Sequence, residues 1–226
     1  MKRILSTLKQ KWPEYLLEMI VITAGIVGAF ALNNWNEGRK SKVKEESMLR
    51  LIHETLERDV DGPIKIFQRR NQNSNHAVNK MLQKCPADSI EIEGLISTLT
   101  FQIDTSPYEQ LQSIGMDLIK NDSLSNSILS TFNNLKWYHG QIHDELNYRL
   151  KDYIIPFVFQ HFEAQLSEND QYDLVPKDYE ALKQNPDWVT VLAHRKTVNK
   201  SDSLLINYAE RDMVFLIEKI EEELNK

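Results

Sequence analysis

The sequence predicts an all-α protein in which an N-terminal transmembrane helix is followed by a domain built as a bundle of long helices. Residues 16–32 include a single charged residue, Glu18. Through most of the remaining chain, apolar residues recur every three or four positions, which is the spacing of one face of an α-helix. The 226 residues include only seven glycines and seven prolines, so few positions oppose helix formation.

The first predicted element is a membrane-spanning helix over residues 13–36, preceded by a short basic leader at residues 1–12. About 21 residues from Tyr15 to Trp35 rise ~31 Å as a helix, which matches the ~30 Å hydrocarbon core of a bilayer. Trp12 precedes this stretch and Trp35 ends it, as aromatic anchors do at the two interfaces of a membrane. Length and flanking residues therefore both favour a span.

The balance of insertion energies also favours a span. Nine strongly apolar residues together contribute about −3 to −5 kcal/mol. A charge at the bilayer centre costs ~3 kcal/mol, and Glu18 lies near one edge, where the cost is smaller. Two alternatives are a core helix of a soluble domain and a signal peptide with its cleavage site at Ala29-Phe30-Ala31. The polar remainder of the chain argues against the first. The charged leader argues against the second, because it is long for a signal peptide and Pro13 follows it.

Basic residues do not decide the orientation of the span, because four precede it and four follow it within residues 1–44. A short basic leader usually stays in the cytoplasm, and a long domain after the span is exported largely regardless of its charge. We therefore expect the large domain to lie outside the cytoplasm. In the opposite orientation, the basic residues after Trp35 would lie on anionic lipid. The single cysteine, Cys85, fits either side, since it cannot form a disulfide within the chain.

Residues 37–226 are predicted to form one helical soluble domain on a helical stalk. Residues 1–40 hold six of the 27 basic and three of the 33 acidic residues, so residues 41–226 carry a net charge of −9. Such an acidic domain is expected to be soluble and is a poor candidate for binding nucleic acid.

Three runs of this domain place apolar residues on one face of a helix and charged residues on the other. Helices with a single apolar stripe bury it against one another, and a bundle is the simplest arrangement that does so. The stripes consist of Leu49, Ile52, Leu56, Val60, Ile64 and Phe67, then Leu124, Ile128, Phe132, Leu135, Ile142, Leu146 and Leu150, and finally Leu205, Ala209, Met213, Leu216, Ile220 and Leu224.

Boundary residues predict where these helices begin, end or bend. Asp61-Gly62-Pro63 and Pro156 are expected to bend or break the helices that contain them. The segment 164–177 is predicted to be a loop, and residues 89–103 have the mixed character of a short strand. The predicted caps are a capping box at Ser106-Pro107-Tyr108-Glu109, closed by Gly115, and N-caps at Asn121-Asp122-Ser123 and Asn185-Pro186-Asp187.

Two motifs carry a resemblance to a known family. Residues 16–40 and 106–129 together resemble a Gram-negative family of small single-span membrane proteins with a helical soluble domain, and the likeness covers most of the chain. The resemblance implies this architecture. With the orientation expected above, the predicted location is the bacterial inner membrane, with the C-terminal domain in the periplasm. The resemblance implies no chemistry, because the function of that family is not established. The matching positions are Asn33, Asn34, Trp35, Asn36 and Glu37, then Tyr108, Glu109, Leu111, Gly115, Asp117, Leu118, Ile119, Asn121, Asp122 and Leu124.

One face of the predicted span gathers acidic and small residues, some of them at the small-xxx-small spacing that lets two helix backbones approach closely. This face predicts a helix–helix interface, with a second copy or with a partner membrane protein, in which Glu18 is buried. The alternative is that Glu18 reaches the nearby headgroups and that the small residues are ordinary for a membrane helix. The members of this face are Glu14, Glu18, Ala24, Gly25, Gly28 and Ala29.

The stretch 106–124 is the most distinctive part of the soluble domain. Its polar residues are candidates for a pocket or a contact surface. The alternative is a structural corner between two helices, in which Gly115 takes a left-handed backbone conformation and Asp122 caps the next helix. The candidate residues are Tyr108, Glu109, Gly115, Asp117, Asn121 and Asp122.

His139 and His143 are one helical turn apart and are weak candidates for metal ligands. Gly140 stands where a zinc protease has its glutamate base, and a third ligand such as His161 or Glu163 rests on no motif. We therefore expect neither a metal nor another cofactor. No nucleophile motif accompanies the serine, histidine and aspartate residues of the chain, so we expect no enzymatic activity.

These observations predict a single-pass membrane protein whose helical domain acts as a scaffold or accessory subunit of a cell-envelope complex. Its expected partners are membrane lipid and either a second copy or another membrane protein. The alternative is a sensory or ligand-binding helical domain on a membrane tether. Such a sensor would need a separate partner for its output, because neither side of the span carries a signalling module.

Overall fold

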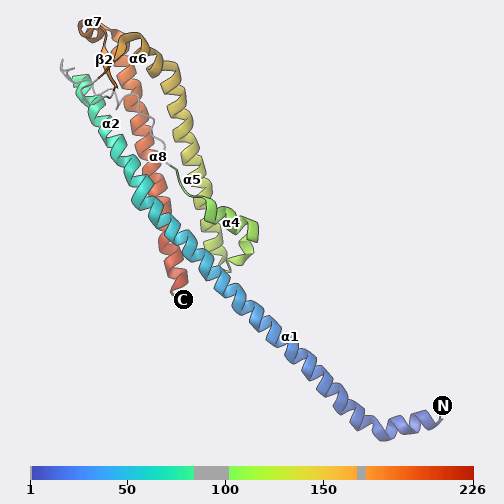
Figure 1. Ribbon diagram of the computed structural model, residues 1–226. Helices are drawn as coiled ribbons and strands as arrows, with labels where there is room; N and C mark the ends of the chain where they lie inside the picture. The colour runs from blue at the N-terminus through green and yellow to red at the C-terminus, as the bar shows by residue number, and fades with distance from the viewer. Residues whose placement is uncertain (1, 84–101, 167–171) are drawn as a thin grey trace. The chain divides into compact units, whose positions relative to one another are not determined.

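The computed structural model describes residues 2–83, 102–166 and 172–226, and their fold is all-α apart from one short hairpin (Figure 1). The chain divides into two compact units, Met1–Met48 and Leu49–Lys226. One long helix, α1 (Lys2–Asp59), forms the described part of the first unit and supplies the first turns of the second.

The first unit consists of α1 up to Met48. This helix is long and apolar enough to cross a membrane. All side chains from Tyr15 to Trp35 are exposed on it. The helix also continues without a break through the residues that follow the apolar stretch, since no boundary lies between Trp35 and Met48.

The second unit contains three long helical runs, in which α8 packs against both α2 and α5 (Figure 1). Each run buries an apolar stripe, as the periodicity predicts. The runs are α1 with η1 (Val60–Ile64) and α2 (Lys65–Gln83), then α5 (Asp122–Arg149) with η3 (Leu150–Ile154) and α6 (Ile155–His161), and α8 (Pro186–Leu224).

Proline loosens two of these runs without ending them. Pro63 lies inside η1, and Pro156 is the second residue of α6, two positions after the end of η3; both η1 and η3 are turns of π-helix. A proline has no N–H to donate and its ring crowds the carbonyl four residues earlier, so a wider turn relieves both problems. Both prolines thus coincide with a local irregularity, and the predicted break is wrong, because the helical run continues through each of them.

Short polar side chains cap two of the helices. Asn121 Oδ1 accepts hydrogen bonds from the backbone N–H groups of Ser123 (3.1 Å) and Leu124 (3.2 Å) at the start of α5. Asn185 Oδ1 accepts one from the N–H of Asp187 (2.9 Å) at the start of α8. These hydrogen bonds confirm both predicted N-caps. They give partners to N–H groups in the first turn of each helix, which have none within the helix.

The prediction of a loop at residues 164–177 is wrong in part, because this segment contains parts of two paired antiparallel strands. Strand β1 (Phe162–Leu166) pairs with β2 (Tyr172–Pro176), with Ala164 opposite Leu174. Lys177 follows the hairpin, and its Nζ donates to the carbonyls of Phe159 and Gln160 (both 3.1 Å) at the end of α6. The strand character noted at residues 89–103 falls almost wholly outside the described residues.

Apolar side chains fill the interior of the second unit on both sides of a polar section. On α8, Trp188, Val191 and Leu192 pack with the ends of α2 and α6, and Ile206 to Ile220 form the second apolar section. Ile206 is fully buried there, whereas the predicted Leu205 is half-buried. The polar section between them was not predicted.

Candidate functional site

The face of small residues on α1 is open in this structure. A Cβ atom added to Gly25 or Gly28 would meet no atom within 4 Å, and Glu18 is exposed. Ala24 and Ala29 are exposed as well. The side chain of Glu14 lies outside the described residues. The face is thus free to meet lipid or another helix, and its role stays a prediction.

Tyr108 of α4 (Ser106–Ile114) belongs to the core of the second unit rather than to a pocket. Its side chain is only 1% exposed, and its ring stacks on Phe132 of α5 at 4.7 Å between centroids and 3° between planes. Gln112 Nε2 donates a hydrogen bond to the Tyr108 hydroxyl (2.9 Å). Burial raises the pKa of the Tyr108 phenol, so it stays protonated and serves packing.

The other candidates of residues 106–124 form the corner between α4 and α5. Gly115 ends α4 with φ +119°, donating its N–H to the Leu111 carbonyl (2.9 Å), and a Cβ there would overlap the Asp117 carboxylate. Only glycine fits without strain. Asn121 caps α5 and also donates to Glu223 of α8. The remaining members, Glu109 and Asp122, are exposed near the starts of α4 and α5, and the cap predicted at Asp122 is wrong, because Asp122 is the first residue of α5 and Asn121 caps it.

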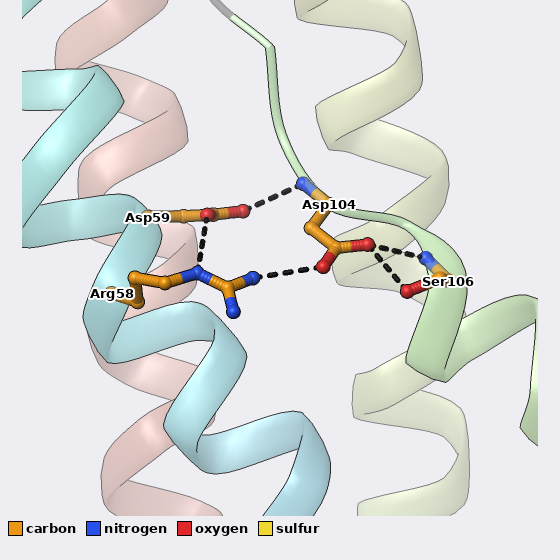
Figure 2. A network of polar contacts seen from close by, with 4 residues as sticks. All are labelled: Arg58, Asp59, Asp104 and Ser106. Atoms are coloured by element: carbon orange, nitrogen blue, oxygen red, sulfur yellow. Dashed lines mark hydrogen bonds and ion pairs between the residues drawn. The ribbon is translucent and has the colours of Figure 1, made fainter.

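Two neighbouring residues of α1 tie this corner to the rest of the unit. Figure 2 shows Arg58 and Asp59 facing Asp104 and Ser106 at the start of α4. The Asp104 N–H donates to Asp59 Oδ2 (2.7 Å), and Arg58 Nη2 donates to Asp104 Oδ2 (2.8 Å). Asp104 Oδ1 accepts the Ser106 N–H (3.0 Å), so Asp104 satisfies this end of α4. The predicted capping box at Ser106 is therefore wrong, because the residue two positions earlier accepts the helix N–H.

Asp59 is the buried member of this network. It is only 4% exposed, and this burial raises the pKa of its carboxyl group. The Asp104 N–H and the Arg58 guanidinium (3.7 Å from Asp59 Oδ1) act in the opposite direction without offsetting burial. The folded chain therefore holds the Asp59 proton to higher pH than the unfolded chain does, and this group's contribution to stability falls as pH rises above ~4.

Asp59→Asn tests this contribution. We expect it to change the free energy of unfolding by less than about 1 kcal/mol at pH 7, because the amide oxygen still accepts the Asp104 N–H. Asp59→Ala removes that acceptor and is expected to cost about 1–3 kcal/mol. The stability of the wild type relative to Asp59→Asn should decrease from pH 4 to pH 7 in thermal melts. A relative stability that increases over this range would show that the charged carboxylate is favoured.

The histidine pair of α5 lacks the surroundings of a metal site. The rings of His139 and His143 stack with centroids 6.3 Å apart, and His143 Nδ1 lies 3.6 Å from the neighbouring Asp144 carboxylate. In the part of the chain that the structure describes, no third histidine, cysteine or acidic ligand joins them.

A section of buried polar residues divides the core, and the sequence analysis missed it. Arg195, Asn199 and Asp202 lie at i, i+4 and i+7 on the buried face of α8, and all three are 0% exposed. Asn71 and Ser74 of α2 are buried beside them. The sign of this section in the sequence was a set of polar residues at positions that continue the apolar face of the helix. We call these five residues the polar layer.

Hydrogen bonds across α2 and α8 hold the polar layer together. Ser74 Oγ accepts from Asn199 Nδ2 (2.9 Å) and from Arg195 Nε (3.3 Å). Asn71 Nδ2 donates to the Asn199 carbonyl (2.8 Å). Burial lowers the pKa of Arg195 to about 10, and the nearby Asp202 carboxylate acts in the opposite direction. The guanidinium therefore remains charged at neutral pH although it is out of contact with water.

A second group outside the predicted sites lies where α1 meets the end of α8 in the second unit. His53 of α1 faces two carboxylates, with Nδ1 3.4 Å from Glu57 Oε2 and Nε2 3.0 Å from Glu221 Oε1. His53 and Glu57 lie one turn apart on α1. This spacing was the only sign of the group in the sequence. A pocket of about 300 Å³ adjoins them, lined by Arg50, His53, Glu54, Glu221, Leu224 and Asn225.

Comparison with known proteins gives no match to this chain among family models, curated proteins or solved structures.

Proposed function

We propose that the protein is a single-pass membrane protein whose helical bundle acts as a scaffold or accessory subunit of a bacterial cell-envelope complex. The observation that carries this proposal is the exposed apolar stretch of α1. All its side chains from Tyr15 to Trp35 are exposed, on every face of the helix. A helix that is apolar all round is stable only when lipid or protein surrounds it. The proposed location is the inner membrane, with the second unit in the periplasm.

Exposed aromatic side chains on the second unit support a role in protein contacts. Leu204, Tyr208 and Phe215 share the outer face of α8, and each is at least 42% exposed. Arg211 lies over the Tyr208 ring at 5.1 Å, and Lys219 over the Phe215 ring at 4.9 Å. Aromatic residues and arginine are enriched in protein interfaces. A partner that covers this face would bury rings that now contact water.

A sensory or ligand-binding domain is the second candidate, and the pocket beside His53 favours it. Its volume of about 300 Å³ is at the lower end of the range for small-molecule sites. Such a domain would pass its signal to a separate partner. The two candidates differ in what accompanies the protein when it is purified.

Mild detergent extraction from native membranes tests the proposal. We expect the protein to purify in a complex of defined stoichiometry, as a homo-oligomer or with another membrane protein. The double substitution Gly25→Leu with Ala29→Leu should reduce that complex at least fivefold, because two added side chains separate the helix backbones. Size-exclusion chromatography with light scattering and mass spectrometry measures both quantities.

The matched control is Thr23→Leu with Val27→Leu, on the opposite face of the same helix. This variant should keep the wild-type assembly. A monomeric wild type without any protein partner would contradict the scaffold proposal. A small molecule bound to that monomer at one per chain would favour the sensory domain instead.

A further inference from the structure

We propose that His53 and Glu221 form a binding site for a divalent transition-metal ion, in which Glu57 holds the imidazole in place. The site does not depend on the proposed function. It joins α1 to the end of α8, so its two ligands come from segments 168 residues apart in the chain.

The distance between the two ligand atoms fits one metal ion. His53 Nε2 and Glu221 Oε1 lie 3.0 Å apart. Two ligands at ~2.1 Å from a metal ion and about 90° apart are separated by roughly 3.0 Å. The ion would replace the hydrogen bond between these atoms without a change in their separation.

Glu57 orients the histidine. Its Oε2 lies 3.4 Å from His53 Nδ1, and one of its carboxylate oxygens lies within 4.8 Å of a Glu221 carboxylate oxygen. A histidine that binds a metal through one nitrogen usually donates the N–H of the other to a carboxylate. Metal binding displaces the proton that the hydrogen bond between Nε2 and Glu221 requires, and the contact with Glu57 then favours the tautomer with its proton on Nδ1. The ligand-type atoms of the three side chains all lie within 4.8 Å of one another, the reach of a single metal site.

The charges around the site favour a cation. Glu54 lines the same pocket, so three carboxylates, Glu54, Glu57 and Glu221, lie near the His53 imidazole. Arg50 also lines the pocket and offsets one of these charges, which leaves a net charge of −2. Water completes the coordination of the ion. A set of one nitrogen and several carboxylate oxygens suits Zn²⁺, Co²⁺, Mn²⁺ and Fe²⁺.

The side chains that bind the ion keep access to water. His53 has 17% of its side chain exposed and Glu221 has 53%. An ion therefore reaches the site through the open pocket without unfolding the chain. Because the ligands belong to α1 and α8, bound metal would also stabilise the folded second unit by mass action.

Binding of Co²⁺ to the full-length protein in detergent is the test. We expect one Co²⁺ per chain by equilibrium dialysis, visible absorption bands of nitrogen and oxygen ligation, and displacement by Zn²⁺. The dissociation constant should rise at least about tenfold in His53→Gln and in Glu221→Gln. For Glu57→Gln it should rise about 10- to 100-fold, the usual effect of losing a group that orients a ligand.

Two control variants make the assignment specific. Glu222→Gln removes an exposed carboxylate next to Glu221, and the double variant His139→Asn with His143→Asn removes the other histidine pair. Both should bind Co²⁺ as the wild type does. Circular dichroism of the metal-free proteins checks that every variant folds, and each substituted group is partly or fully exposed. No stoichiometric Co²⁺ binding, unchanged binding in Glu221→Gln, or loss of binding in the His139/His143 variant would overturn the proposal.

Discussion

Replacing Ile22 and Ile26 of α1 with aspartate is expected to move the protein from the membrane to the soluble or aggregated fraction. The apolar residues of the span contribute about −3 to −5 kcal/mol to insertion. Each aspartate near the bilayer centre costs ~3 kcal/mol and also removes an isoleucine that favours insertion. Two substitutions therefore outweigh the whole apolar contribution, whereas Glu18 alone does not.

Extraction with alkaline carbonate and flotation on a density gradient measure this effect. The wild type should stay with the membrane, and the double variant should not. Val43→Asp, on the same helix but beyond the apolar stretch, should behave as the wild type does, because no charge is added within the span. Release of the wild type by carbonate would contradict a membrane span. It would indicate instead that another protein covers the exposed apolar residues.

Replacing Arg195 with alanine is expected to lower the free energy of unfolding by about 3–5 kcal/mol. The substitution leaves the Asp202 carboxylate buried without the guanidinium that lies near it, and it opens a cavity in the core. For a chain of this size the melting temperature should fall by about 6–20 °C. Thermal unfolding followed by circular dichroism in detergent gives this value.

Removing both charges should cost much less than removing one. Arg195→Met with Asp202→Leu keeps the core filled and leaves no buried charge at either position, and such replacements are often neutral or stabilising. Arg70→Ala, at an exposed position of α2, should change stability by less than about 0.5 kcal/mol. A loss below about 1 kcal/mol for Arg195→Ala would mean that water reaches this charge.

The polar layer raises the question of why a chain would keep it. The polar layer lies between the two apolar sections of the core. Its polar side chains contribute less to the free energy of folding than buried apolar side chains would. Its hydrogen bonds between Ser74, Arg195 and Asn199 form only when α2 and α8 have one relative position along their axes. Uniform apolar stripes would pack in several such positions. We therefore expect the double variant to fold with a less unique register, which broadens its NMR spectrum.

Local features of the sequence predicted most of the helices correctly. Asn121 and Asn185 cap the helices that they precede, Pro63 lies in the first π-helical turn, and Pro156 lies two residues after the second. Hydrogen bonds of a cap and the steric effect of proline act within about four residues. The sequence around each of these positions therefore contains all the groups involved.

The prediction failed where local features were ambiguous. Residues 162–166 and 172–176 pair as antiparallel strands, although Ser167, Glu168 and Asn169 give the segment the polar composition of a loop. The capping box was assigned to Ser106, but Asp104 accepts the N–H at that end of α4 and itself contacts Arg58 of α1. By their local sequence, both Asp104 and Ser106 could cap this end of α4. The contact with Arg58, which is distant in sequence, favours Asp104.

The amino-acid order alone established an all-α chain with one N-terminal helix that is long and apolar enough to span a membrane, because periodicity and length are properties of single helices. Packing of the second unit decided which polar residues meet. Ser74 and Arg195 are 121 residues apart, and His53 and Glu221 are 168 apart. Such pairs depend on the rotation and axial position of each helix, which all the side chains of the core set together. The polar layer and the proposed metal site are therefore visible only in the folded chain.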